Sequence, residues 1–232
     1  MKKVLCATLI LAFMAPVAWA TIKGSPHDLA SSNTAANMES LTVDRTCVFC
    51  HTPHAADTTE SKAPLWNRAV AYDFNAVSLY TSSATLTATA KAVDEAAIEA
   101  TDAPLCMSCH DGTLGDNLNN VPNGYAATDF EDADFANAGS MTATALIIDA
   151  DGLSNDHPIG FNYNTVQGED ATGLKAIATA KTNGAAFYGA SSEMMWCSSC
   201  HDVHEYGTSG TTQPFLIMTN AGSDLCFACH NK

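Results

Sequence analysis

One short motif occurs four times in this 232-residue chain and limits its possible folds more than any other feature. Each copy has the form Cys-x-x-Cys-His, and the cysteine pairs are Cys47 and Cys50, Cys106 and Cys109, Cys197 and Cys200, and Cys226 and Cys229. At this spacing the two thiols can form thioethers to a porphyrin edge while the next histidine binds the iron, so the motif predicts an attached c-type haem. The sequence therefore predicts four covalently bound, iron-containing haem c groups.

The remaining cysteine belongs to a predicted export signal. The chain has nine cysteines, and the ninth, Cys6, lies within the first twenty residues. Lys2 and Lys3 precede an apolar stretch, and residues 18–20 (AWA) have the form of a signal-peptide cleavage site. Residues 1–20 are therefore predicted to be a signal peptide and residues 21–232 a single tetrahaem cytochrome c domain. The apolar run is too short for the alternative, a retained membrane anchor, so a secreted protein that does not span the membrane is expected.

Zinc is the main chemical alternative, because two Cys-x-x-Cys pairs can supply four thiolate ligands. In this chain a histidine directly follows every pair. The pairs begin 59 (106 − 47), 91 (197 − 106) and 29 (226 − 197) residues apart. A zinc site does not need the histidine, so haem attachment is the better interpretation.

The histidine count matches the haem count. Four irons with two axial imidazoles each need eight histidines, and the chain has eight. Methionine is the alternative axial ligand, but the methionines in or beside the motifs are better explained by packing against porphyrin. The predicted proximal iron ligands are His51, His110, His201 and His230. The predicted distal iron ligands are His27, His54, His157 and His204.

The positions of the four distal histidines support ligation. His54 and His204 each follow a motif histidine by three residues, which is too close for either to reach the opposite face of the same haem. Each is therefore expected to bind a different haem and to hold two haems close together. His157 precedes Pro158, which favours an extended loop that presents the imidazole. His27 lies near the mature N-terminus, where ligation would fix a loose end; a surface histidine is the alternative.

The predicted fold is a multihaem cytochrome c that is mostly irregular loop, with short helices and few short strands wrapped around the haems. Glycine and small polar residues are scattered through the chain, which is typical of turns and loops. A short helix is predicted over residues 91–100, and strands over 142–149 and 212–218. Residues 111–196 contain no motif and are predicted to be a loop-rich wrap, and the unequal motif spacing argues against a regular solenoid.

The chain is strongly acidic. Its formal net charge is −15, and removal of Lys2 and Lys3 with the signal gives −15 − 2 = −17. Such a chain is not expected to bind nucleic acid, whose phosphates it would repel. Basic redox proteins and positively charged metal oxides are candidate electron partners, and solubility alone is the alternative explanation of the charge.

With these motifs the chain resembles the extracellular multihaem cytochromes of metal-respiring prokaryotes, in particular the filament-forming tetrahaem outer-membrane cytochromes of the OmcE kind. The resemblance spans the mature chain and is carried by short segments, namely residues 24–29 (GSPHDL), 47–54 (CVFCHTPH), 155–161 (NDHPIGF) and 226–230 (CFACH). It implies a homopolymer, a helical filament in which the haems form one continuous chain that carries electrons out of the cell. It also implies that a histidine of one subunit binds a haem of the next, and the terminal position makes His27 the candidate.

The predicted function is therefore electron transfer in anaerobic respiration, by a carrier and not an enzyme. Irons with two histidine ligands have no open coordination position, so they pass electrons without binding substrate. Two alternatives remain at this stage. A soluble periplasmic shuttle would use the same haems without a polymer, and a haem reductase would need one iron with an open face.

Overall fold

The computed structural model of the chain describes residues 22–33, 38–54, 56–69, 72–82, 84–112, 133, 135–141, 145–205 and 215–231. The predicted signal peptide lies outside the described residues. Regular structure within them consists of short helices, and the pairing between extended segments is confined to isolated bridges. The 3₁₀ helices are η1 (Thr46–Phe49), η2 (Phe74–Ala76), η3 (Tyr80–Ser82), η6 (Ala136–Gly139), η7 (Cys197–Ser199) and η8 (Ala221–Ser223). The α-helices are α1 (Ala88–Lys91), α2 (Glu95–Glu99), α3 (Ala103–His110), α5 (Tyr163–Glu169), α6 (Ile177–Thr182) and α7 (Asp224–Cys229).

The helix expected over residues 91–100 is divided in two. Lys91 closes α1, and α2 begins only after Asp94, whose backbone is extended with φ −109° and ψ 176°. The Asp94 side chain caps α2 by accepting a hydrogen bond from the backbone N–H of Ala97. Because a cap residue must leave the helical conformation, Asp94 interrupts a segment whose other residues favour a helix.

The two predicted strands are absent from the described parts of their segments. Residues 145–148 form a turn and bends, Asp149 makes a single bridge to Gly152, and Leu216 makes a single bridge to His201. Residues 142–144 and 212–214 lie outside the described residues. Each segment instead lies alongside a motif. The Ile147 N–H donates to the His110 carbonyl at 3.1 Å, and Leu216 makes its bridge to His201. Strand-forming composition reflects packing as much as backbone preference, and here the residues pack without a sheet.

Two apolar clusters lie beneath the loops. The larger cluster is formed by residues of α1, α2, α3, α5 and α6 and their connections, and its most deeply buried large side chains include Tyr80, Tyr163 and Phe74. The smaller cluster packs Phe49, from the first motif, edge to face against Phe135 at 6.0 Å between ring centres. Helices this short are marginal in isolation, so these contacts rather than helix propensity hold them.

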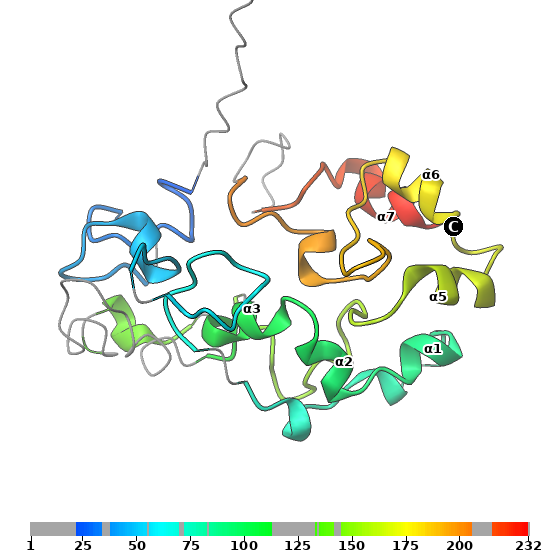
Figure 1. Cartoon of the computed structure of the whole chain (residues 1–232), viewed down its shortest axis with the longest axis horizontal. Coiled ribbons are helices and arrows are strands. Elements are labelled where there is room, and N and C mark those ends of the chain that lie inside the picture. The colour runs from blue at the N-terminus through cyan, green and yellow to red at the C-terminus, as the bar shows by residue number, and fades with distance from the viewer. Residues whose placement is uncertain are drawn as a thin grey trace, which may run out of the picture.

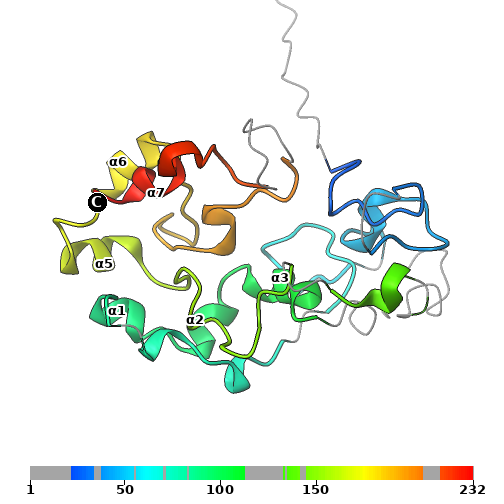
Figure 2. The same ribbon diagram turned by 180° about the vertical axis from the view of Figure 1, so that it is seen from behind.

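The four motif-bearing elements follow one another along the longest axis of the molecule. Figure 1 shows η1 in the blue segment at one end, then α3, then η7 in the orange segment, and α7 at the other end. The reverse view in Figure 2 has the same order. No helix among the described residues is long and apolar enough to cross a membrane.

Candidate haem-binding site

Each motif occupies one helical turn at or near a helix end. The backbone N–H of the motif histidine donates to the carbonyl of the first cysteine in three of them, at 2.9 Å for His51, 3.2 Å for His201 and 2.9 Å for His230. His110 is the last residue of α3. This turn brings both cysteines and the histidine of a motif to one place, as attachment to a single haem requires. We number the motifs 1 to 4 in chain order.

Three of the four predicted distal histidines lie opposite a motif histidine. The ring centres of His204 and His51 are 6.1 Å apart, and those of His27 and His110 are 5.9 Å apart. The ring centres of His157 and His230 are 6.3 Å apart. Two imidazoles that bind one metal at about 2.0 Å each have ring centres about 6 Å apart, once about 1.1 Å from nitrogen to ring centre is added on each side. The three pairs therefore have the separation that a shared iron requires.

Backbone carbonyls orient three of these imidazoles. The Nδ1 atoms of His51, His110 and His157 lie 2.8, 2.6 and 3.0 Å from the carbonyl oxygens of Pro64, Ala145 and Pro158. A carbonyl can only accept, so each Nδ1 must carry the proton and donate it. The Nε2 atom of each ring is then left with its lone pair available to a metal, which is the usual arrangement of a ligating histidine. The donor set therefore fits a haem iron.

His27 lies within its own chain's histidine cluster. Its ring stacks on Phe215 at 4.2 Å between centres and faces His110. Burial, together with the nearby His110, His201 and His204, lowers the pKa of His27 to about 4. A hydrophobic stack and a motif histidine of the same chain thus hold His27 in place, and its ligation of a haem in a neighbouring subunit stays a prediction.

His54 and His201 are the two predicted ligands that remain once these three pairs are made. His54 is exposed in the loop after η1, where its carbonyl accepts a hydrogen bond from Thr52 Oγ1 at 2.7 Å. His201 is also exposed and lies at the end of motif 3. These two histidines complete the set of eight predicted ligands.

The hydrogen bonds around motifs 1 and 3 reveal an internal repeat. Motif 3 repeats the pattern of motif 1 at a constant offset of 150 residues (201 − 51), and residues 65 and 215 share a left-handed backbone with φ 58° and 63°. The matching contacts are the bridges His51–Trp66 and His201–Leu216, the bonds Thr52 N–H to Leu65 O and Asp202 N–H to Phe215 O at 2.8 Å, and Asn67 N–H to Cys50 O and Ile217 N–H to Cys200 O at 3.0 Å.

The repeat extends to the distal histidines. His27 precedes motif 1 and pairs with motif 2, just as His157 precedes motif 3 and pairs with motif 4. We call the segment from His27 to His110 repeat 1 and the segment from His157 to His230 repeat 2. The sequence signal for this repeat was the histidine three residues after the motif histidine in motifs 1 and 3, which motif 2 lacks.

Buried polar groups lock motif 1 to motif 2. Arg68, only 3% exposed, donates from Nη1 to the Phe49 carbonyl at 2.7 Å and from Nη2 to Ser108 Oγ at 2.7 Å. The same Nη2 lies 3.5 Å from Cys109 Sγ. Its guanidinium also lies over the Trp66 ring, 4.7 Å from the ring centre. One cation therefore joins two consecutive motifs.

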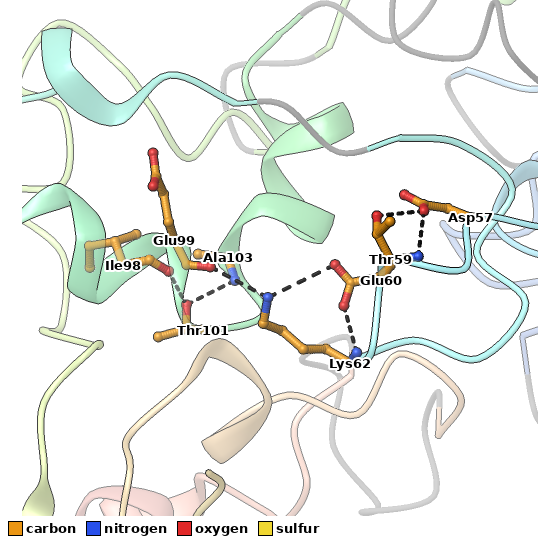
Figure 3. A network of polar contacts seen from close by, with 8 residues as sticks. All are labelled: Asp57, Thr59, Glu60, Lys62, Ile98, Glu99, Thr101 and Ala103. Carbon is orange, nitrogen blue, oxygen red and sulfur yellow. Dashed lines mark hydrogen bonds and ion pairs between the residues drawn. The ribbon is translucent and has the colours of Figure 1, made fainter.

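A second link between these motifs lies at the surface. Figure 3 shows Lys62, in the loop after motif 1, reaching the Glu99 carbonyl at 3.4 Å and Glu60 at 3.9 Å. Beside it, the Thr101 hydroxyl donates to the Ile98 carbonyl at 2.7 Å and accepts from the Ala103 N–H at 3.0 Å. Thr101 thereby fixes the start of α3, the helix that carries motif 2.

A buried carboxylate joins motif 2 to motif 3. Asp102, 6% exposed, accepts hydrogen bonds from the backbone N–H groups of Cys197 and Ser198 at 2.9 Å each and from the Ser198 hydroxyl. These are the amides at the start of η7, which have no partner inside the helix. A hydrogen bond between the Cys106 and Cys197 thiols, together with burial, raises the pKa of Cys197, so the two motifs are in contact.

Hydrogen bonds from residues 175–188 hold motifs 3 and 4 to the same segment. Tyr188 Oη donates to the Ser198 carbonyl at 3.1 Å, and Asn183 Nδ2 donates to the Ala228 carbonyl at 3.2 Å. The Lys175 N–H donates to the Cys229 carbonyl at 2.8 Å. The motifs are therefore linked in the order 1, 2, 3, 4, which sequence reasoning did not predict because buried links carry no local signal.

Exposed apolar side chains gather at the motif segments. Among the described residues, the large apolar side chains with the highest exposure are Leu65 (53%), Val203 (41%), Phe227 (43%) and Leu41 (60%). The first three lie beside or within a motif segment. Large exposed apolar side chains usually mark a surface that another group covers, and a porphyrin face is apolar.

Comparison with known proteins agrees with this geometry. Residues 190–232 match the protein-family pattern described as "Doubled CXXCH motif", which covers motifs 3 and 4. No curated protein matched the chain. The doubled motif, together with a fold of short helices and loops, indicates a multihaem c-type cytochrome that carries covalently attached haem c and transfers electrons.

Proposed function

We propose that the protein transfers electrons through four haem c groups, each bound by two cysteines and two histidines. The observation that carries this proposal is the set of three imidazole pairs, with ring centres 5.9 to 6.3 Å apart. A haem held between two imidazoles supplies reversible one-electron chemistry. The chain's own part is to attach, orient and space these groups, and the order of the four motifs along the long axis provides the path.

The two repeats are related by a step along the axis and not by a closed two-fold rotation. A two-fold axis would convert the contact between motifs 2 and 3 into an equal contact between motifs 4 and 1. Motifs 4 and 1 instead lie at opposite ends of the molecule (Figure 1). Units related by an open step can continue the same contact indefinitely, which produces filaments.

This open relation between the repeats supports the polymer. It also favours His54, in place of His27, as the histidine that joins two subunits. Within the chain, His204 of repeat 2 pairs with His51 of repeat 1. The residues at the same positions one step along are His54 and His201. We infer that His54 of one subunit pairs with His201 of the next, so that the joint between subunits repeats the joint within the subunit. Such a homopolymer would act outside the cell, with metal oxides or other redox proteins as electron acceptors.

The test of haem binding comes first. The chain is produced with its signal peptide in a bacterium that attaches c-type haems, and the intact mass gives the number of haems per chain. Four haems and a low-spin spectrum that does not respond to carbon monoxide are expected. Fewer than four haems would refute the tetrahaem proposal, and a carbon monoxide complex in the assembled protein would favour a reductase with one open iron.

The test of the polymer compares two histidine variants by electron microscopy. The wild type is expected to form filaments with continuous haem density. His54→Ala is expected to give discrete subunits in which one iron has gained an open face. His27→Ala is the matched control, because it removes a distal ligand within the subunit and should leave filaments intact. Normal filaments of His54→Ala would exclude His54 as the joint, and discrete wild-type particles would favour the periplasmic shuttle.

A further inference from the structure

The two repeats differ in one buried charge. Arg68, which joins motifs 1 and 2, is at the position equivalent to Met218 in repeat 2 (68 + 150 = 218). Its hydroxyl partner Ser108 is at the position equivalent to Ala228 (108 + 120 = 228). A buried cation therefore joins motifs 1 and 2, and repeat 2 has a half-buried methionine at the equivalent position.

The charge of Arg68 is permanent and poorly screened. Arginine keeps its proton at every physiological pH, and Arg68 is 3% exposed. Its hydrogen bonds go to neutral groups, namely the Phe49 carbonyl, Asn67 Oδ1, Ser108 Oγ and Cys109 Sγ. Its Nε atom is buried and has no hydrogen-bond partner within the described part of the chain. No described carboxylate lies within ion-pair distance of this guanidinium.

The field of Arg68 reaches the attachment points of both motifs of repeat 1. Arg68 Nη2 lies 3.5 Å from Cys109 Sγ in motif 2, and Arg68 Nη1 donates at 2.7 Å to the carbonyl of Phe49, the residue before Cys50 in motif 1. Asp111, directly after motif 2, has the opposite charge, but it is only half-buried. In repeat 2, the Lys175 ammonium donates to the Phe227 carbonyl within motif 4, but this lysine is only half-buried, so water screens its charge more than that of Arg68.

A buried charge near a haem shifts the reduction potential of that haem. Reduction adds one electron to a haem. A nearby buried cation attracts this negative charge and so stabilises the reduced haem relative to the oxidised haem. Charge and burial around a haem are among the means by which a protein sets its potential. Asp102, buried between motifs 2 and 3, has the opposite sign and lies on the border between the repeats.

We propose that Arg68 holds the two haems of repeat 1 at higher reduction potentials than the two haems of repeat 2. Electrons added to the protein then occupy the haems of repeat 1 first. Along the chain, the haem reduction potential falls once per subunit, between repeat 1 and repeat 2. This inference rests on the haem binding proposed above, and its test is separate from that of haem binding because it begins only with protein shown to contain four haems.

The test is a spectroscopic redox titration of four charge variants. Arg68→Met copies repeat 2 and should lower the potential of two haems, with about a tenfold fall in their reduced-to-oxidised ratio at fixed potential, which corresponds to 59 mV for one electron. Arg68→Lys keeps the charge and should titrate close to the wild type. Arg45→Met is the matched control, because Arg45 is exposed beside motif 1 and water screens its charge.

The fourth variant keeps the test informative if Arg68→Met fails to fold. Met218→Arg adds the charge at the equivalent position and should raise the reduction potentials of the two haems of repeat 2. The four haems should then be reduced over a narrower range of potential than in the wild type. A titration of Arg68→Met or of Met218→Arg that superposes on the wild type would overturn the proposal. So would an equal loss in Arg68→Lys and Arg68→Met, since that result would assign the effect to packing and not to charge.

Discussion

At the residue scale, the imidazole of His157 is oriented by the residue that follows it in the chain. His157 donates its Nδ1 proton to the carbonyl of Pro158, the next residue, at 3.0 Å. Burial lowers the pKa of His157, and this favours the neutral ring that a metal needs. Its own loop thus orients the ring that faces His230.

Replacing His157 is expected to open one iron. His157→Ala should leave motif 4 with a single axial histidine, so one haem becomes high-spin and binds carbon monoxide while the other haems do not. The absorbance change on addition of carbon monoxide measures the fraction of responding haem. His157→Met is the control, because a methionine can restore a sixth ligand and raise that haem's potential. A His157→Ala spectrum that carbon monoxide leaves unchanged would show that His157 is not a ligand.

Asp102 provides a second prediction at this scale. Asp102→Ala leaves the amides of Cys197 and Ser198 buried without an acceptor, at about 1–3 kcal/mol for each such group. We expect a loss of about 2–4 kcal/mol in the free energy of unfolding, measured with urea. Asp151→Ala, at an exposed aspartate, is the control and should change stability by less than about 0.5 kcal/mol. Equal midpoints for the two variants would contradict the proposed link.

At the element scale, the loops are held by close backbone contacts instead of by sheets. Gly152 has a φ of +65°, and a Cβ at this position would lie 2.6 Å from the Ser78 carbonyl oxygen. The Leu153 N–H donates to the same carbonyl at 2.8 Å. The loop that leads to His157 is therefore seated on the segment between η2 and η3, and only glycine allows so close an approach.

Gly152→Ala is expected to destabilise the protein by more than backbone strain alone. Gly222 is the matched control, because its φ of +63° is similar and a Cβ there would meet nothing within 4 Å. Gly222→Ala should cost about 1 kcal/mol from the left-handed backbone. Gly152→Ala should cost about 1–3 kcal/mol more, from the clash with Ser78. Thermal unfolding of both variants measures the difference, and equal losses would mean that the contact with Ser78 has no energetic weight.

The elements also show how far the sequence could lead. The motifs and the eight candidate ligands were identifiable because haem attachment needs fixed residue types at fixed short spacing. The described parts of the predicted strands, residues 145–149 and 215–218, form no sheet, because β-branched side chains favour any packed extended segment. Arg68 and Asp102 could not be found at all, since burial depends on contacts between residues that are 40 or more positions apart in the chain, such as Arg68 and Ser108.

At the scale of the whole molecule, the protein core is divided and thin. The two apolar clusters are separate, and the longest helix, among the described residues, has eight residues. Apolar side chains beside the motifs are exposed where a porphyrin would cover them. The haems are therefore expected to supply a large part of the buried apolar contact.

The chain made without haem is accordingly expected not to fold. Production in a host compartment that lacks the haem-attachment system should give a chain that unfolds without a cooperative transition and is digested rapidly by protease. The haem-loaded protein, digested in parallel, is the control and should resist. A cooperative thermal transition in the haem-less chain, followed by circular dichroism, would show that the protein part suffices for folding.

The open relation between the repeats has a mechanical consequence. The joint inside a subunit and the joint between subunits are then the same iron–imidazole contact. The two kinds of joint alternate along the filament and resist stretching with equal strength. Only the inner joint is backed by the covalent chain, so it can open and close again under load without separating the pieces. Breakage by shear would then always occur between molecules, and every fragment would contain a whole number of subunits.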